Sequence, residues 1–318
     1  MRAGASRGCG RAVSNLTYTL RLLQPRYWPT WLMLAIMRVM SLLPLFIRRA
    51  IARILGGVLS RLPLRFVHIA RRNLELCLPE MPAKRRRHIL RGHFRSLAMG
   101  MFETALSWWA SDRRILQLTK VEGEEHLRAA LERGRGAILL SAHFTTLEMG
   151  ARAVAARWPL NIMYRPTRNP VLEHFLNRMR ARRAKRAIAR DDIRTLVGAL
   201  RNNEPVWYAP DQSYRKKGAQ MVPFFGVPAA TNTATSRLAR MTGAAVLPYF
   251  QERLPGSQGY RCVIHPMLEN FPSDDPVADA ERFSKLIEQQ IRRTPEQYLW
   301  IHRRFKGLTP EYPDFYRK

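Results

Sequence analysis

The sequence predicts an α/β fold, in which a layered sheet, mixed or largely parallel, is flanked by helices. From residue 137 onward, short apolar runs typical of buried strands alternate with longer segments that repeat apolar residues at helical spacing. Turn-forming residues separate these segments, as Gly243 does after the helical stretch 233–241. Residues 50–115, in contrast, look helical. A chain of 318 residues can bury a sizeable core, and we expect one main domain over residues 48–318.

The individual elements follow from local patterns along the chain. A long helix is expected to open at residues 84–87 and to run toward Trp109, with an apolar stripe at Ile89, Phe94, Leu97, Met101 and Leu106. The expected strands are residues 137–141, 160–164, 206–209, 245–250 and 260–264. The expected helices of this half are residues 147–158, 170–186, 193–201 and 233–241.

The N-terminal region has a different composition. Residues 1–26 are basic, contain Gly and Ser, and are expected to form a poorly ordered arm. Residues 27–47 carry only one charge, Arg38, and would just span a bilayer core of about 30 Å. Arg38 would cost on the order of 2.5–3.5 kcal/mol at the centre of a span, and Pro44 would kink the helix. We therefore expect a membrane-attachment helix, spanning or interfacial; the alternative is a buried amphipathic helix.

The charge balance indicates anionic partners. The chain has 54 Lys and Arg against 24 Asp and Glu, a formal net charge of +30, which suits nucleic acid, anionic lipid or an acidic protein. No RNA- or DNA-binding signature accompanies this charge, so nucleic acid is not the expected partner. Three widely spaced cysteines, Cys9, Cys77 and Cys262, predict neither a disulfide framework nor a metal site.

A histidine and a carboxylate lie at the end of the first expected strand. His143 stands between that strand and the helix that begins near Leu147, at the crevice where ligands of α/β sheets bind. This position suits a general base. Glu148 lies about one helical turn further on and would orient or charge-stabilise the imidazole. The alternative is a capping box, in which Thr145 and Glu148 only satisfy backbone donors at the helix start.

Two other loops reach the same edge of the sheet. Arg165 ends its strand and would bind phosphate or stabilise a developing oxyanion, unless it is simply a surface arginine. Asp211 and Gln212 follow the strand 206–209, where they would hold a sugar hydroxyl, an amide or Arg165 itself. Ordinary turn chemistry at Pro210 and Asp211 is the alternative.

Basic residues are concentrated between positions 178 and 190, with no acid among them. The seven are Arg178, Arg180, Arg182, Arg183, Lys185, Arg186 and Arg190. Like charges at helical spacing repel one another, so an anionic partner is expected to offset them. Residues 84–87 form a second basic patch suited to anionic headgroups.

Four ordered blocks carry a family resemblance. They are His143 with Glu148, Met-Tyr-Arg-Pro at 163–166, Tyr-Ala-Pro-Asp-Gln-Ser-Tyr at 208–214, and Val-Pro-Phe-Phe-Gly at 222–226. Together they resemble the late acyltransferases of lipid A biosynthesis, within the lysophospholipid acyltransferase superfamily. The likeness runs from about Arg26 to the C-terminus. The glycerolipid branch usually has aspartate where this chain has Glu148, and glutamate is more usual in the lipid A branch.

The resemblance implies an O-acyltransferase that uses no cofactor. It would move a fatty acyl chain from an acyl carrier protein thioester to the hydroxyl of a 3-hydroxyacyl chain on a Kdo-lipid A precursor. His143 and Glu148 would be catalytic, with Arg165, Asp211 and Gln212 on the substrates. The catalytic domain would lie on the cytoplasmic side of the bacterial inner membrane. The carrier would dock on Arg182, Arg183 and Arg186.

The sequence leaves two further points undecided. Phe224 and Phe225, within residues 222–228, would line an acyl-chain groove or else belong to the plain core. The acceptor could also be another glycolipid or a phospholipid, and the chain could instead be a non-catalytic basic protein that binds membrane or nucleic acid. A serine or cysteine hydrolase is not expected, because no convincing nucleophile is present.

Overall fold

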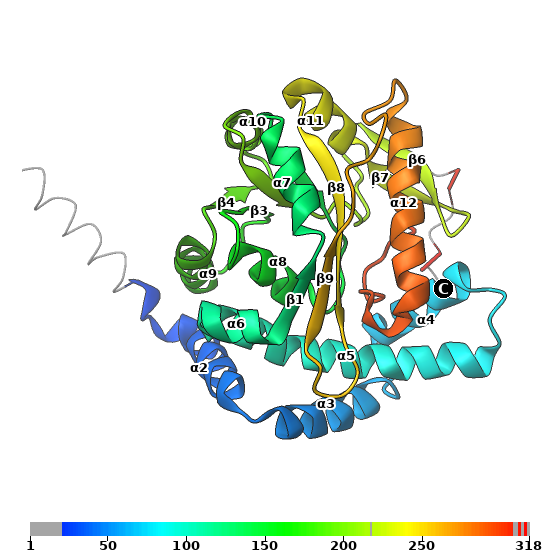
Figure 1. Ribbon diagram of the computed structural model, residues 1–318. Coiled ribbons are helices and arrows are strands. Elements are labelled where there is room, and N and C mark those ends of the chain that lie inside the picture. Colours follow the sequence, from blue (N-terminus) through cyan, green and yellow to red (C-terminus); the bar gives the residue numbers. More distant parts are fainter. Residues whose placement is uncertain (1–20, 217, 308–310, 313–314, 317–318) are drawn as a thin grey trace, which may run out of the picture.

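A seven-stranded sheet lies at the centre of the molecule, with helices on both of its faces (Figure 1). The computed structural model describes residues 21–216, 218–307, 311–312 and 315–316. The strands of this sheet are β1 (Thr119–Glu122), β2 (Ala137–Leu140), β3 (Asn161–Tyr164), β4 (Arg186–Ala189), β5 (Pro205–Tyr208), β8 (Ala245–Arg253) and β9 (Tyr260–Ile264). Strands β6 (Ala219–Phe224) and β7 (Val227–Asn232) form a separate antiparallel hairpin.

The sheet is mixed but largely parallel, as predicted. Its order is β1-β9-β8-β2-β5-β3-β4. Strands β8, β2, β5, β3 and β4 are parallel neighbours, whereas β9 runs antiparallel to β8 and parallel to β1. The carboxyl ends of β2, β5 and β3 therefore meet at one edge of the sheet, where the three loops with candidate site residues emerge.

Helices cover the two faces because alternate strand residues point to opposite sides. In β2, Ile138 and Leu140 join one hydrophobic cluster while Ala137 and Leu139 join another. The first cluster packs against helices α4 (Arg65–Cys77), α5 (Ala83–Trp109), α10 (Ile193–Arg201), α11 (Ala234–Thr242) and α12 (Pro276–Arg293). The second packs against α7 (Glu124–Glu132) and α8 (Leu147–Ala155). Both faces of β2 are thus sealed from water.

Helix α5 confirms the expected long helix, and its stripe is buried at Ile89 and Phe94. Met101 is an exception, being 54% exposed. The helix expected over residues 170–186 is shorter: α9 (Pro170–Arg183) ends before β4, which the sequence analysis missed. Strand β4 forms because it pairs with β3 at the edge of the sheet and buries Ile188. The remaining short helices are η1 (Pro25–Tyr27), α6 (Asp112–Leu118) and η2 (Pro295–Gln297).

The single helix expected over residues 27–47 is wrong. The chain instead forms α2 (Trp28–Leu42) and α3 (Leu45–Leu59), separated at Leu43 and Pro44. A residue before proline is driven to extended geometry, and Leu43 has ψ 140°. Each helix has 15 residues, about 22 Å at 1.5 Å per residue. None of the helices in the described residues is long and apolar enough to cross a membrane.

The basic arm predicted for residues 1–26 lies mostly outside the described residues, as does Cys9. In its described part, residues 21–26, Leu22 is buried at 3% exposure while the other residues are exposed, and the Trp31 indole N–H donates to the Leu22 carbonyl oxygen at 2.9 Å. Leu22 and Leu34 cluster with Val171 of α9. Residue 22 and helix α2 are therefore packed against α9 of the main domain.

Candidate functional site

His143 and Asp211 face each other across the neighbouring carboxyl ends of β2 and β5. The Nδ1 atom of His143 lies 2.5 Å from Oδ1 of Asp211, and the backbone N–H of His143 donates to Oδ2 at 3.0 Å. Asp211 is 2% exposed in its side chain, and His143 is 27% exposed. The carboxylate is thus a buried support for an imidazole that still reaches solvent.

Each group of this pair shifts the pKa of the other. Burial alone lowers the pKa of His143, but the charge of Asp211 and its hydrogen bond outweigh burial and raise that pKa above 6.5. Burial raises the pKa of Asp211, yet the attraction and hydrogen bonds of His143 leave it below its ordinary value. An ionised Asp211 holds the proton of the neutral ring on Nδ1, so that Nε2 is the nitrogen that accepts a proton.

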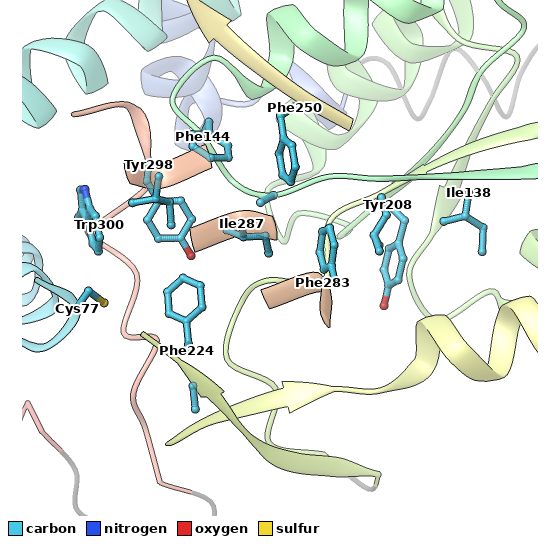
Figure 2. Packing of buried hydrophobic residues seen from close by; sticks show 14 of the residues in the cluster. Cys77, Ile138, Phe144, Tyr208, Phe224, Phe250, Phe283, Ile287, Tyr298 and Trp300 are labelled. Atoms are coloured by element: carbon cyan, nitrogen blue, oxygen red, sulfur yellow. The ribbon is translucent and has the colours of Figure 1, made fainter. Parts of the chain in front are cut away.

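Tyr298, far along the chain, also contacts the carboxylate of the His143–Asp211 pair. The Tyr298 hydroxyl donates to Oδ2 of Asp211 at 3.3 Å. The ring of Tyr298 packs edge-on against Phe144 at a centroid distance of 5.5 Å, and against Trp300 at 5.0 Å (Figure 2). This packing fixes the position from which the hydroxyl reaches the carboxylate.

The loop that carries His143 is held by the C-terminal segment. The N–H of Leu299 donates to the His143 carbonyl at 3.0 Å, and the N–H of Thr145 donates to the Gln297 carbonyl at 2.7 Å. Phe144 and Tyr298 form an isolated antiparallel bridge between these two bonds. Residues 297–299 therefore brace the loop like a short strand, a role that nothing in their local sequence indicates.

Glu148 does not orient the imidazole, contrary to the sequence-based expectation. Within the described structure it makes no hydrogen bond or ion pair with His143, whose Nδ1 is taken by Asp211. The capping box is not formed either: Thr146 is the N-cap of α8, and its side chain makes no capping bond. In the described structure Glu148 lines a cleft instead, so it forms neither a direct contact with the imidazole nor a capping box.

Glu148 faces a cleft between α5, α8 and α9. Most of its lining residues are apolar: Trp108, Ala151, Ala155, Ile162, Leu176, Met179 and Ala184. The Glu148 side chain remains open to solvent, yet the walls of the cleft raise its pKa, against the opposing effects of the Arg180 charge and of a hydrogen bond from Trp108. Arg180 also lies over the Tyr164 ring, 4.0 Å from its centroid.

Arg180 is a site residue that the sequence analysis did not single out. It appeared there only as one of seven basic residues. The useful signal was helical spacing: Leu176, Met179 and Arg180 share one face of α9, and this face forms a wall of the cleft.

The other predicted substrate residues lie at the same sheet edge but are not brought together. Arg165 is exposed, and it has no ion pair within the described residues. Gln212 is half-buried beside Asp211. In the described structure Asp211 does not contact Arg165, and its two oxygens are occupied by His143 and Tyr298. Strand β5 lies between β2 and β3, which separates the loop of Arg165 from that of His143 by one strand.

Phe224 belongs to the plain core, with 1% exposure, and it packs against Tyr298 at 6.1 Å (Figure 2). Phe225 is half-buried next to it, and the guanidinium of Arg292 lies 5.0 Å from its ring centroid. Neither ring lines the cleft that contains Glu148. Phe224 instead lines a separate pocket that Asp211, Phe271 and Phe283 also line, so this hairpin contributes to the core around Asp211.

The basic run is partly neutralised within the molecule. Arg183 pairs with Asp112 at 3.3 Å, and Arg186 lies 3.7 Å from Glu204. Arg182 is exposed and makes no ion pair within the described residues. The run also changes structure, since Arg186 begins β4. Internal carboxylates thus offset part of the charge of this run, at Arg183, Lys185 and Arg186.

The chain is similar to known proteins over most of its length. The family model of the bacterial lipid A biosynthesis acyltransferases matches residues 17–307. The chain is 39% identical over 300 residues to the lipid A biosynthesis lauroyltransferase of Escherichia coli (strain K12), covering 94% of this chain and 98% of that protein.

Two other Escherichia coli (strain K12) proteins match over similar lengths. The lipid A biosynthesis palmitoleoyltransferase is 39% identical over 290 residues, covering 91% of this chain and 94% of the relative. The lipid A biosynthesis myristoyltransferase is 27% identical over 288 residues, covering 90% and 89%. Because the family model matches nearly the whole length of this chain, the chain belongs to the bacterial lipid A biosynthesis acyltransferases.

Proposed function

We propose that this protein transfers a fatty acyl chain from an acyl carrier protein thioester to the hydroxyl of a 3-hydroxyacyl chain on a Kdo-lipid A precursor. The observation that carries the proposal is the His143–Asp211 pair at the carboxyl edge of the sheet. A carboxylate that holds Nδ1–H leaves Nε2 as a base for a hydroxyl group. The names of the relatives supply the class of acceptor.

The reaction balances with the groups at this edge. Nε2 of His143 takes the proton of the acceptor hydroxyl while the oxygen attacks the thioester carbonyl carbon. The tetrahedral oxyanion then collapses, the C–S bond breaks, and the imidazolium returns its proton to the leaving thiolate. Arg165 is exposed on the loop after β3, one strand beyond β5, and has no ion pair in the described structure; it supplies positive charge toward the oxyanion or a substrate phosphate.

The cleft beside Glu148 is the proposed place for one substrate. Its aliphatic lining suits an alkyl chain, and Glu148 with Arg180 provides polar groups that fix orientation. Helix α8 begins where the His143 loop ends, so the cleft and the base share one short segment of chain. Glu148 thus acts on a substrate in this proposal, rather than on the imidazole.

Helices α2 and α3 are the proposed membrane attachment, lying in the interface instead of crossing it. Apolar side chains are exposed on both helices: Trp28, Leu32, Met33, Ile36, Val39, Leu42, Phe46, Ile54, Leu55 and Val58. A soluble domain rarely shows so many large apolar side chains on one pair of helices, and an interfacial helix places such a face among lipid acyl chains. The proposed location is the cytoplasmic face of the inner membrane.

The acyl carrier protein is the proposed acyl donor, docking near the end of α9. Arg178 and Arg182 are exposed there without ion pairs in the described structure, and they lie next to the cleft wall that α9 provides. Arg183 and Arg186 have internal partners, so their contribution is smaller than expected from the sequence. An acidic carrier would complement the exposed charges.

Lipid A mass spectrometry tests the function directly. Cells that lack the gene should make lipid A that is lighter by one acyl chain, and the wild-type gene should restore that mass. His143→Ala should fail to restore it, whereas His68→Ala, which changes an exposed histidine on α4, should succeed. A change in another glycolipid with unchanged lipid A would name a different acceptor. No lipid change at all would refute acyl transfer.

A further inference from the structure

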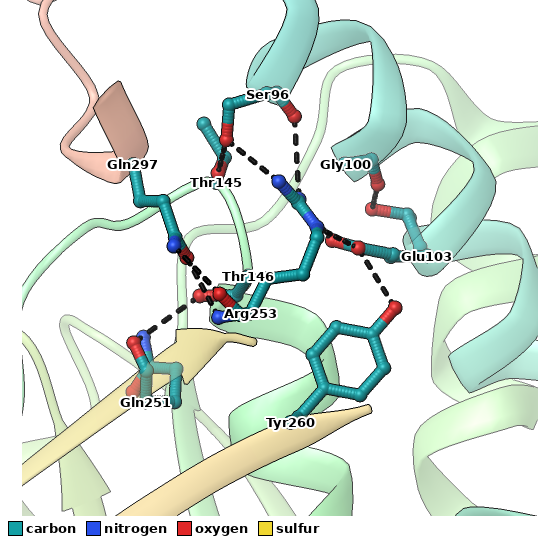
Figure 3. Close-up of polar contacts among 10 residues, drawn as sticks. Ser96, Gly100, Glu103, Thr145, Thr146, Gln251, Arg253, Tyr260 and Gln297 are labelled. Atoms are coloured by element: carbon teal, nitrogen blue, oxygen red, sulfur yellow. Dashed lines mark hydrogen bonds and ion pairs between the residues drawn. The ribbon is translucent and has the colours of Figure 1, made fainter. Parts of the chain in front are cut away.

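A buried ion pair joins helix α5 to the end of strand β8. Arg253, the last residue of β8, makes a two-pronged contact with Glu103 of α5, and its Nη2 lies 2.6 Å from Oε2 (Figure 3). The Glu103 side chain is 1% exposed and also accepts from the Tyr260 hydroxyl at 2.7 Å. Both carboxylate oxygens are therefore engaged, and the orientation of the Arg253 guanidinium is fixed.

Hydrogen bonds from the Arg253 guanidinium connect it, through Ser96, to the loop of His143. Nη1 of Arg253 donates to the Ser96 hydroxyl at 2.8 Å, and Nη2 reaches the Ser96 carbonyl at 3.3 Å. The Ser96 hydroxyl lies 2.7 Å from that of Thr145, two residues after His143 (Figure 3). An unbroken chain of polar contacts thus leads from Glu103 to the loop.

The backbone of Arg253 holds the other support of the loop. Oε1 of Gln297 accepts from its N–H at 2.7 Å, and Nε2 of Gln297 donates to its carbonyl at 3.0 Å. The Gln297 carbonyl in turn accepts from the Thr145 N–H at 2.7 Å. Thr145 is therefore held from its side chain and from its backbone, and both routes begin at Arg253.

Close packing leaves the loop little freedom. A Cβ atom on Gly100 of α5 would lie 2.7 Å from the Thr145 carbonyl oxygen, so the helix touches the loop backbone directly. Gly100 lies between Ser96 and Glu103 on one face of α5, at spacings of four and three residues. This face of the helix is shaped to the loop.

We infer that Arg253 is a positioning residue, which acts through Ser96, Gln297 and Thr145 to hold His143 against Asp211. The inference rests on the proposed acyl transfer with His143 as base. It assigns to α5, the helix against which α2 and α3 pack, a direct part in placing the base. A misplacement of about 1 Å from a distant mutation can cost on the order of 100-fold in rate.

Steady-state kinetics with purified enzyme, an acyl carrier protein thioester and a Kdo-lipid A precursor test this inference. Thr145→Val, which removes only the hydroxyl, should lower kcat by about 10- to 100-fold with little change in either KM. Thr145→Ser restores the hydroxyl and should restore kcat. Thr104→Val is the matched control, because that hydroxyl on α5 donates only to the Gly100 carbonyl, and its kcat should stay at the wild-type value.

A charge-free variant separates positioning from folding. Removing one partner of a buried ion pair strands the other charge, whereas removing both is often neutral for stability. Arg48 is buried and is also attracted by Glu103, so it is replaced as well. Arg48→Met/Glu103→Leu/Arg253→Met/Tyr260→Phe should therefore keep its melting temperature near that of wild type while kcat falls as in Thr145→Val. A folded Thr145→Val enzyme with wild-type kcat would overturn the inference. This test remains valid even if the charge-free variant does not fold. Lack of acyl transfer by the wild-type enzyme would instead refute the proposed function.

Discussion

Replacement of Asp211 by asparagine should both slow the reaction and move its pH dependence. Asp211→Asn keeps the size of the side chain but removes the charge that lies 2.5 Å from Nδ1 of His143. Asp211 raises the pKa of His143 against the opposing effect of burial, so the variant imidazole should have a lower pKa than in the wild type. The acidic limb of the rate profile should then move to lower pH, because His143 acts as a base only when neutral.

The loss in rate follows from the tautomer. An asparagine amide can donate to Nδ1, which would place the ring proton on Nε2 and remove the acceptor that the reaction needs. Loss of a base typically costs 10²–10⁴-fold. Each tenfold loss corresponds to about 1.36 kcal/mol, so the barrier should rise by roughly 3–5 kcal/mol. Because the Asp211 side chain is only 2% exposed, water is not expected to replace the lost carboxylate as the acceptor for the Nδ1 proton.

The assay is the dependence of log kcat/KM on pH, with Glu148→Gln as the comparison. Glu148→Gln should lower the rate but leave the acidic limb in place, because Glu148 makes no contact with His143 in the described structure. An Asp211→Asn profile that keeps its limb, together with a Glu148→Gln profile that moves, would refute the reasoning. That outcome would mean that Glu148, and not Asp211, sets the pKa of His143.

Three further predictions concern binding and stability. Arg178→Gln/Arg182→Gln should raise the KM for the acyl carrier thioester and flatten its salt dependence, with kcat retained; unchanged KM with lowered kcat would exclude donor docking. Ile36→Glu, at a side chain 51% exposed, should reduce flotation with anionic vesicles without unfolding the protein; undiminished flotation would exclude α2 as the attachment. His93 is buried, and burial lowers its pKa to about 4, so the unfolded chain binds more protons than the folded chain between pH 4 and 6.5. The free energy of unfolding should therefore fall on acidification through this range, by up to about 1.4 kcal/mol per pH unit. In urea denaturation, the midpoint of His93→Leu should fall less steeply with decreasing pH than that of the wild type.

The sequence predicted the elements whose patterns are local. Strand β2 and the stripe of α5 could be read because their apolar residues follow one period without interruption. Strand β4 could not, since Lys185 and Arg186 continue the basic composition of α9 and only the pairing with β3 marks a strand. The break between α2 and α3 was foreseeable at Pro44, yet the overall apolarity of residues 27–47 suggested one helix.

The partner of His143 could not be read from the sequence, because strand order decides it. Asp211 lies 68 residues after His143 and becomes its neighbour only because β5 pairs with β2. Had β3 taken that place, the loop of Arg165 would lie beside the imidazole instead. The supports at residues 297–299 depend in the same way on where the C-terminal segment crosses the sheet edge.

The two carboxylates near the site are suited to different tasks, and their surroundings explain why. Burial raises the pKa of Asp211, but the charge of His143, its two hydrogen bonds and the charge of Arg304 outweigh burial and keep that pKa below the ordinary value, so the carboxylate charge is available to the imidazole. Glu148 stands in a mostly apolar cleft with its pKa raised, where an approaching alkyl chain would displace water and Arg180 would be its main ionic partner. In the proposed reaction, the histidine–glutamate motif at the end of β2 therefore divides into a base, supported from β5, and a carboxylate that acts on substrate.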